Sequence, residues 1–368
     1  MIDLAATEKP VVTNIQDYDN DPWLFNCANG TLNLRTAEFR SHRCEDMMTK
    51  ISPVVYDPGA ACPTFERFIH WAHGGDQQMI DFLARAAGYS LTGDTGIQAL
   101  FFNHGDGANG KGTFTELLRF ILGDYGRDTS FTTFVNDKNK SEHRNDIAAL
   151  RGARFVTASE SSDGHYLDEE LIKKITGCDP ITVRELYGKP FTFLPAMKLW
   201  FQSNYQPTIK GQDWGIWRRV KMIPWEQIVD LDKADDKLPA KLRAESSGVL
   251  NWMLSGLKTY LEFGMMYPEK VEAATQQYRD AMDIIGRFVG TCCAIKESAT
   301  AVGSEVYAGY VGWCKANGEF PMKRRKFDAE LRKKYPLKSE HSRVGVVWGG
   351  VGLLREGRYP EAADIDCM

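Results

Sequence analysis

A glycine-rich loop between an apolar run and a helical pattern constrains this chain more than any other feature. Ala99 to Asn103 is a short apolar run, Gly105 to Gly112 is rich in glycine, and Phe114 to Leu122 has apolar residues at helical spacing. Two later runs, Arg154 to Ala158 and Lys198 to Gln202, have the composition of buried strands. Strands that alternate with helices indicate parallel pairing through helical crossovers. The sequence therefore predicts an α/β fold with a mostly parallel sheet.

The loop has the sequence of a phosphate-binding loop. The pattern G-x-x-x-x-G-K is met within Gly105, Asp106, Gly107, Ala108, Asn109, Gly110, Lys111, Gly112 and Thr113. Glycines let successive backbone N–H groups surround phosphate oxygens, and the lysine reaches the outer phosphates. A chain with 33 glycines also meets this pattern by chance, but the strand before it and the helix after it reduce that chance. We predict that these residues bind ATP.

Two residues are candidates for holding Mg²⁺. Gly112 stands where most phosphate-binding loops carry a Ser or Thr hydroxyl that binds this ion, so Thr113, one residue later, is the candidate hydroxyl. Glu160 follows the second predicted strand, where a carboxylate can support Mg²⁺ and activate the attacking water. An ordinary solvated acid at a strand end is the alternative interpretation of Glu160.

Three further polar residues complete the set of catalytic candidates. Asn204 follows the third predicted strand, where an amide either orients the attacking water or simply forms a turn. Arg218 and Arg219 form either a surface salt bridge or an arginine finger that acts across a subunit interface. With Lys111 and Glu160, they make up the predicted catalytic residues.

Besides an N-terminal hairpin described below, the sequence predicts a second hairpin between Glu160 and Asn204. Ile181 to Leu186 and Phe191 to Leu194 have the pattern of its arms, and the segment from Tyr187 to Pro190 that of its turn. Arg184, Tyr187 and Lys189 put two cations and an aromatic ring at or near the tip. Such a tip suits stacking on single-stranded nucleic acid, although any exposed β-turn also carries such residues.

The flanking segments predict additional units. A hairpin is expected over residues 23–40, with Trp23 to Cys27 and Thr31 to Leu34 as strands around Asn29-Gly30. Helices are expected at 65–72 and 79–87, with Thr64 and Asp76 as N-caps. Helical spacing returns at 250–263 and 271–289. The last unit has two helices (306–314 and 327–334) and a β-like tail (344–348), the order of a winged helix. We place the domain boundaries at 1–93, 94–230, 231–290 and 291–368.

Charge and cysteine spacing limit the class of protein. The net charge of −4 excludes a generally basic nucleic-acid-binding chain, but ten basic residues face four acids between Lys315 and Arg343. Lys323, Arg324, Arg325 and Lys326 are therefore candidate contacts to DNA phosphates. The eight cysteines include no C-x-x-C pair, which favours reduced thiols over a zinc site. No apolar stretch has the length of a membrane span, so we expect a soluble cytoplasmic protein without membrane contacts.

Together these motifs resemble superfamily 3 helicases. The resemblance rests on the order of the loop, Glu160, the Arg184 to Lys189 hairpin, Phe201-Gln-Ser-Asn204 and Trp217-Arg-Arg219. More narrowly, the chain looks like the helicase half of phage and plasmid primase-helicases, the group that includes the satellite-phage and poxvirus enzymes. The run from Leu171 to Arg184 is similar to the most recognisable segment of that group.

The resemblance implies a specific activity. It implies an AAA+ core in a homohexameric ring, with ATP and Mg²⁺ at subunit interfaces and 3′ to 5′ movement on single-stranded or forked DNA. In this scheme Lys111 holds phosphates, Glu160 supports Mg²⁺, Asn204 senses the γ-phosphate, and Arg218 or Arg219 acts on the neighbouring subunit. A primase or polymerase domain or subunit is the expected partner, and host cytoplasm the expected location if a phage encodes the chain.

Two alternatives remain open from the sequence. Gly112 is compatible with a replication-initiator ring that binds ATP and DNA but turns ATP over weakly. A phosphate-binding loop is also compatible with a small-molecule kinase, in which Arg218 and Arg219 would act within one subunit.

Overall fold

The computed structural model describes residues 17–136, 144–159, 164–185, 187–230, 232, 234–342 and 345–354. Glu160, Leu186 and Val344, which belong to predicted sites or elements, lie outside these ranges. The chain divides into two compact units, Met1–Gln276 and Gln277–Met368, and the finer subdivision given above stays a prediction. Among the described residues, no helical segment combines the length and the apolar composition of a membrane span.

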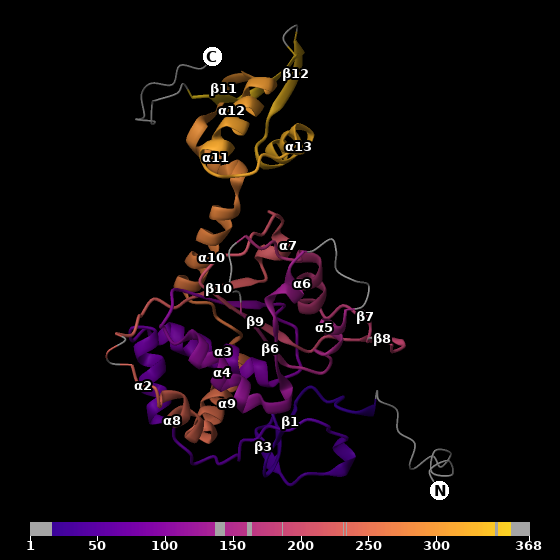
Figure 1. Ribbon diagram of the computed structural model, residues 1–368, viewed down its shortest axis with the longest axis vertical. Coiled ribbons are helices and arrows are strands. Elements are labelled where there is room, and N and C mark those ends of the chain that lie inside the picture. Colours follow the sequence, from indigo (N-terminus) through magenta and orange to yellow (C-terminus); the bar gives the residue numbers. More distant parts are fainter. Residues whose placement is uncertain are drawn as a thin grey trace. The chain divides into compact units, whose positions relative to one another are not determined.

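The first unit is built around a five-stranded parallel sheet (Figure 1). Its strand order is β10-β4-β9-β6-β5, and every neighbouring pair is parallel. The strands are β4 (Leu100–His104), β5 (Gly126–Ser130), β6 (Phe155–Ser159), β9 (Lys198–Ser203) and β10 (Val220–Pro224). The predicted α/β fold is confirmed, and the three predicted strands are the three central ones.

The sequence does not predict the two outer strands, because neither has an uninterrupted apolar run. β5 has the sequence Gly-Arg-Asp-Thr-Ser with mostly exposed residues. An outer strand has one neighbour and less burial, so its sequence needs no apolar run. In β10, Lys221 interrupts the apolar residues and Pro224 ends the strand.

Aromatic rings fix the helix that follows the glycine loop, α4 (Lys111–Leu122), against the sheet. The ring of Phe114 lies 6.1 Å from that of Trp200 on β9 and 5.5 Å from that of Trp225. Trp225 also donates a hydrogen bond from its Nε1 to Asn103 Oδ1 at 2.8 Å. Because these side chains are fully buried, the position of the first turn of α4 is well determined.

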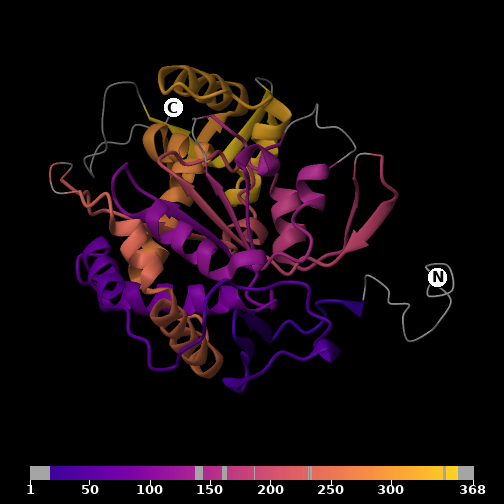
Figure 2. The ribbon, with the colours of Figure 1, turned by 60° about the horizontal axis from the view of Figure 1, so that its bottom comes forward.

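Shorter elements surround the sheet. They are η2 (Cys44–Asp46), η3 (Gly123–Tyr125), η4 (Phe131–Phe134), α5 (Asn145–Ala148), α6 (Glu169–Thr176), α7 (Trp214–Trp217) and α8 (Leu238–Ala244). The predicted second hairpin is present as antiparallel β7 (Ile181–Arg184) and β8 (Pro190–Phe193). It stands out from the body of this unit (Figures 1 and 2).

The N-terminal hairpin is also confirmed. β1 (Leu24–Cys27) pairs with β2 (Gly30–Asn33), and a third strand, β3 (Glu38–Arg40), continues the sheet. A Cβ at Gly30 would lie 2.5 Å from the carbonyl oxygen of Arg40, so the approach of β3 requires glycine there.

One predicted helix cap is right and the other is wrong. Helices α2 (Pro63–Ala72) and α3 (Gln77–Leu91) occupy the predicted segments, and Asp76 accepts from the N–H of Met79 at 3.2 Å. Thr64 lies inside α2, which begins at Pro63. The carboxylate of Glu245, 181 residues away, accepts the N–H groups of Thr64 and Phe65 instead. A cap supplied from so far along the chain leaves no local sequence signal.

Helix α9 (Ser246–Phe263) packs closely along α3. A Cβ at Gly256 would lie 2.0 Å from the carbonyl oxygen of Ala84, and one at Gly88 would lie 2.3 Å from that of Met253. These glycines allow the two helix backbones to approach each other. The predicted helix at 271–289 is two helices, α10 (Glu269–Met282) and α11 (Ile284–Cys292), because Asp283 caps the second.

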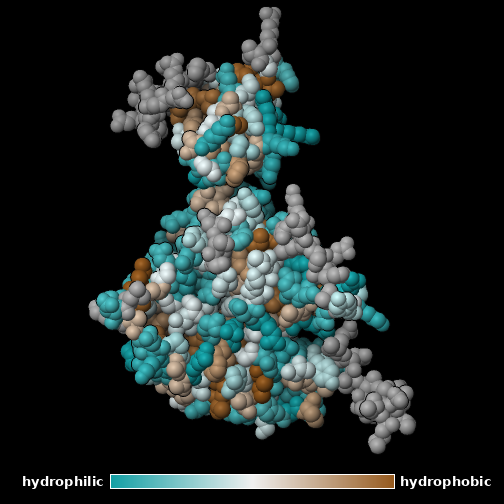
Figure 3. Space-filling view, in the orientation of Figure 1, coloured by the Kyte–Doolittle hydropathy of each residue, from teal (hydrophilic) through white to brown (hydrophobic). Residues whose placement is uncertain are grey.

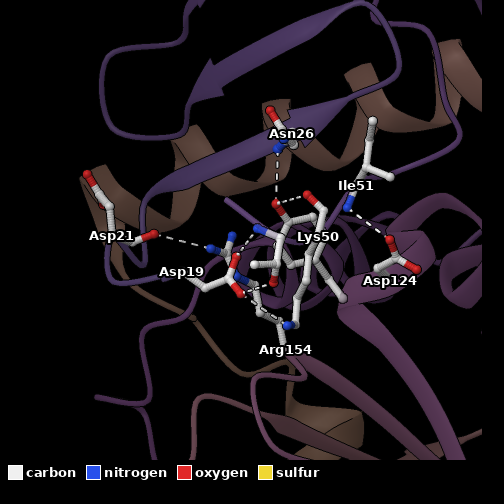
Figure 4. Close-up of polar contacts among 9 residues, drawn as sticks. Asp19, Asp21, Asn26, Lys50, Ile51, Asp124 and Arg154 are labelled. Atoms are coloured by element: carbon white, nitrogen blue, oxygen red, sulfur yellow. Dashed lines mark hydrogen bonds and ion pairs between the residues drawn. The ribbon is translucent and has the colours of Figure 1, made fainter. Parts of the chain in front are cut away.

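Buried cations join the sheet to the segments that precede it. Arg154 lies just before β6 and donates to the carbonyl oxygens of Leu91 at 2.7 Å and Asp21 at 3.3 Å. Figure 4 shows it beside the ion pair of Asp19 and Lys50, whose atoms are 3.2 Å apart. Burial acts to raise the pKa of Asp19, but hydrogen bonds from Thr49 and the charge of Lys50 outweigh it and lower that pKa.

The second unit has the predicted order of helix, helix and hairpin. These elements are α12 (Gly303–Ala316), α13 (Arg324–Lys334), β12 (Lys338–Ser342) and β13 (Gly345–Leu353). An additional strand, β11 (Cys293–Val302), pairs with β13 and completes a sheet of order β11-β13-β12. Phe288, Tyr310, Phe327 and Trp348 form the core of this unit.

Candidate functional site

The glycine loop lies at the carboxyl end of β4, next to the carboxyl end of β9. Gly105 has φ +153° and a Cβ there would lie 2.2 Å from the carbonyl oxygen of Trp225. Gly110 has φ +89°, and a Cβ there would lie 2.9 Å from the ring of Phe68. Asn109, only 2% exposed, donates to the carbonyl oxygen of Trp225 at 3.1 Å and accepts from the Lys111 N–H at 3.3 Å. Sterics and this buried amide therefore fix the loop conformation.

The structure brings Lys111 and Asn204 together across 93 residues of sequence. Lys111 Nζ donates to Asn204 Oδ1 at 2.7 Å and to the carbonyl oxygens of Gly105 and Asp106, both at 2.8 Å. Partial burial lowers the pKa of Lys111. His104, which ends β4, has its pKa lowered by burial and by the charge of Lys111, while a hydrogen bond with the Asn204 backbone opposes that shift.

A second group of polar side chains, which sequence analysis did not indicate, lies at the first turn of α4. Gln202 on β9 donates from Nε2 to Ser159 Oγ at 2.6 Å and accepts at Oε1 from Thr115 Oγ1 at 3.1 Å. Gln202 follows the apolar residues of β9, and Thr115 lies between Phe114 and Glu116 on α4, so neither has a local signal of a shared polar site. Their meeting follows from the register, in which β9 lies between β4 and β6.

The two candidate metal ligands, Thr113 and Glu160, differ in their position relative to this cluster. Thr113 does not join the Gln202 cluster; it lines a hollow of about 230 Å³ together with Glu116 and Arg243. Glu160 lies outside the described residues, but β6 ends at Ser159, directly before it. Ser159 is paired in register with Gln202, so the end of β6 adjoins the cluster.

The two arginines are separated by their environments. Arg219 is 8% exposed, and its guanidinium donates to Thr176 Oγ1 and to Gln98 Oε1, both at 2.9 Å. Arg218 is exposed and shares the same Gln98 oxygen as acceptor. The guanidinium of Arg219 is thus held inside the chain by Thr176, while Arg218 is exposed.

These arginines lie beside the amino ends of the strands, whereas the glycine loop lies at their carboxyl ends. The carbonyl oxygen of Arg219 accepts from the N–H of Leu100, the first residue of β4, whereas the loop follows the last residue, His104. β4 has five residues, and at about 3.3 Å per residue its two ends lie roughly 16 Å apart. The structure therefore does not bring Arg218 to Lys111 within one chain.

Both predicted DNA-contacting surfaces are exposed. Tyr187 lies at the turn of the β7–β8 hairpin with 98% of its surface exposed, and Arg184 and Lys189 are exposed beside it. In the second unit, Lys323, Arg324, Arg325 and Lys326 are exposed at the beginning of α13, whereas Phe327 and Leu331 face the core. Figure 3 shows the hydrophilic side chains that cover this part of the second unit.

Three family models match separate parts of the chain. The model described as "D5 N terminal like" matches residues 1–74. A family of unknown function (DUF5906) matches residues 103–219, from the end of β4 to Arg219. The model described as "Poxvirus D5 protein-like" matches residues 280–343, within the second unit.

Viral proteins are similar over most of the chain. "Putative helicase L207/L206" of Acanthamoeba polyphaga mimivirus is 26% identical over 75% of this chain and 31% of its own length. "Putative helicase 022R" of Frog virus 3 is 26% identical over 66% of this chain and 27% of its own. A "Putative primase" of African swine fever virus is 24% identical over 82% of this chain and 34% of its own. The chain thus spans about a third of the length of these relatives.

The fold has a counterpart among solved structures. The apo structure of the NrS-1 C-terminal region aligns with a TM-score of 0.50 at 12% identity, over 82% of this chain and 78% of that one. At this identity the likeness concerns the fold alone. The D5-type matches at both ends and the relatives named as putative helicases and primases, together with this fold, support a superfamily 3 primase-helicase type.

Proposed function

We propose that this chain is the ATP-driven helicase part of a viral or mobile-element DNA replication enzyme, acting as a ring with 3′ to 5′ movement. One observation carries the proposal: Lys111 and Asn204 lie together at the carboxyl ends of the strands, and exposed Arg218 lies at their amino ends. A site divided in this way is completed by a neighbouring copy, as in a heterologous ring.

Within one chain, the loop would bind the phosphates of ATP. Its backbone N–H groups and the first turn of α4 favour negative charge, and Lys111 would exchange Asn204 and the loop carbonyls for phosphate oxygens. The amide of Asn204 would then be free to orient the attacking water. Glu160, placed after β6, is the proposed base for that water.

The donor set fits the Mg²⁺ that accompanies ATP. Gln202 forms hydrogen bonds with the hydroxyl groups of Thr115 and Ser159, so its side-chain oxygen and these two hydroxyl oxygens lie close together. Mg²⁺ prefers oxygen ligands of this kind. When bound, the ion neutralises charge on the phosphates. Asn103 is paired in register with Gln202 and is fully buried, and its Nδ2 has no hydrogen-bond partner among the described residues.

The two exposed basic surfaces would hold DNA in different ways. Tyr187 at the hairpin tip suits stacking on a base, with Arg184 and Lys189 beside it for the backbone. The exposed cations of α13 suit phosphates of duplex or forked DNA.

Gly112 supports a second candidate, a DNA-binding ring that ATP gates with little turnover. The kinase alternative has less support, because Arg218 and the loop of its own chain lie at opposite ends of the strands.

Steady-state ATP hydrolysis tests the proposal, measured with Mg²⁺ in the presence and absence of single-stranded DNA. We expect DNA to stimulate turnover and Lys111→Ala to abolish it. Turnover that DNA leaves unchanged would contradict a motor. Absence of turnover in a folded sample that still binds an ATP analogue would favour the gated ring.

A further inference from the structure

Gly112 leaves open the space in which related loops place a hydroxyl. A Cβ added at Gly112 would meet a single described atom within 4 Å, Gln202 Oε1 at 3.9 Å. Packing therefore does not force glycine at this position. The atom nearest to the space is a side-chain oxygen that another strand supplies.

Two hydroxyl groups hold that oxygen in place. Gln202 Nε2 donates to Ser159 Oγ at 2.6 Å, and Gln202 Oε1 accepts from Thr115 Oγ1 at 3.1 Å. The first contact comes from the neighbouring strand β6 and the second from α4. The side chain is thus fixed between the sheet and the first turns of the helix that follows the glycine loop.

Gln202 Oε1 can exchange its hydrogen bond for a cation at little cost. Thr115 has one hydroxyl hydrogen and three acceptors within reach, which also include the carbonyl oxygens of Lys111 at 3.0 Å and Gly112 at 3.1 Å. If a cation takes Gln202 Oε1, Thr115 still donates to the Lys111 carbonyl, so no buried donor is left unpaired.

We propose that the side-chain oxygen of Gln202 is a protein ligand of the Mg²⁺ that accompanies ATP, in place of the hydroxyl that Gly112 lacks. A side-chain carbonyl suits this ion, and like the hydroxyl it is uncharged. The inference rests on the proposed function only in requiring that the loop bind ATP.

Nucleotide binding measures this role without any turnover. The dissociation constant of a non-hydrolysable ATP analogue is determined by calorimetry for the full chain, with Mg²⁺ and with EDTA. In the parent chain we expect Mg²⁺ to tighten binding. In Gln202→Ala we expect that gain to fall by at least about tenfold, the lower end of the loss seen when even outer-shell metal partners are removed. The affinity in EDTA should stay unchanged, which also shows that the variant is folded.

A rescue separates a ligand from a merely structural residue. Adding Gly112→Ser to Gln202→Ala should restore the Mg²⁺ dependence, because it returns a hydroxyl to the open space. Adding Gly112→Ala, which fills the same space without an oxygen, should not. Gln206→Ala, the same change four residues further on, should behave like the parent chain.

The outcomes also distinguish this inference from the function on which it rests. If Gln202→Ala keeps the full gain from Mg²⁺, or if Gly112→Ala rescues as well as Gly112→Ser, Gln202 is not a ligand. If the parent chain binds no analogue in either buffer, the proposed nucleotide site itself is wrong.

Discussion

At the scale of single residues, two buried cations of the first unit donate hydrogen bonds to backbone carbonyl oxygens. Arg154, just before β6, and Lys198, the first residue of β9, are both buried and donate to carbonyl oxygens of the segment around Leu91 and Thr92. Burial lowers the pKa of both side chains, yet their carbonyl partners compensate for part of the lost hydration. These contacts hold the connection between α3 and β4, and so the strand that carries the glycine loop.

His73 has no such compensation and should make the stability of the protein depend on pH. It is 4% exposed, packs on Trp225 at 4.5 Å, and neither ring nitrogen has a hydrogen-bond partner among the described residues. Burial, assisted by the charge of Lys270 and opposed by Asp76 and Glu226, lowers its pKa from 6.5 to about 4. Between these values only the unfolded chain binds the proton, so stability falls as pH falls, by about 2 kcal/mol at pH 5.

Denaturant unfolding between pH 7.5 and 4.5 checks this prediction. His73→Leu should reduce the pH dependence by that amount. The same change at His70, an exposed histidine of α2, serves as the control and should leave the dependence as it is in the parent chain. Equal pH dependence in His73→Leu and the parent would contradict the lowered pKa.

At the scale of elements, burial decides what the sequence can predict. The central strands β4, β6 and β9 are covered on both faces, so they appear as apolar runs, whereas the outer strand β5 does not. Polar residues that follow central strands are similarly visible: Asn204 comes directly after β9, and the loop that ends in Lys111 comes after β4, so both could be predicted as site residues.

The same reasoning explains which site residues sequence analysis could not resolve. The Gln202 cluster depends on strand order, which links residues far apart in the chain. The difference between Arg218 and Arg219 depends on which of the two adjacent side chains is buried beside Thr176. Neither property leaves a local pattern.

The basic helix α13 carries a prediction about DNA affinity. Reversing the charges of Lys323, Arg324 and Arg325 to glutamate should weaken duplex binding. It should also reduce the slope of log K against log salt by about 0.9 for each DNA phosphate that the variant no longer neutralises. The measurement is fluorescence anisotropy with a labelled duplex at several salt concentrations.

A matched variant controls for total charge. Arg127, Lys237 and Lys258 are exposed basic residues of the first unit, and their reversal changes the net charge equally. If both triple variants lower the slope alike, DNA is attracted by overall charge and α13 has no special role. A slope that stays at the parent value in the α13 variant would also contradict the assignment.

At the scale of the whole molecule, the separation of loop and arginine makes the number of copies part of the chemistry. A Lys111→Ala chain still presents Arg218, and an Arg218→Ala chain still has an intact loop. In a ring that mixes equal amounts of the two, about a quarter of the interfaces join an intact loop to an intact arginine. We therefore expect two inactive preparations to regain about a quarter of the parent ATPase activity when they are assembled together. Differently tagged chains that co-purify without regaining activity would show that Arg218 does not complete a neighbour's site, and the ring mechanism would lose its structural basis.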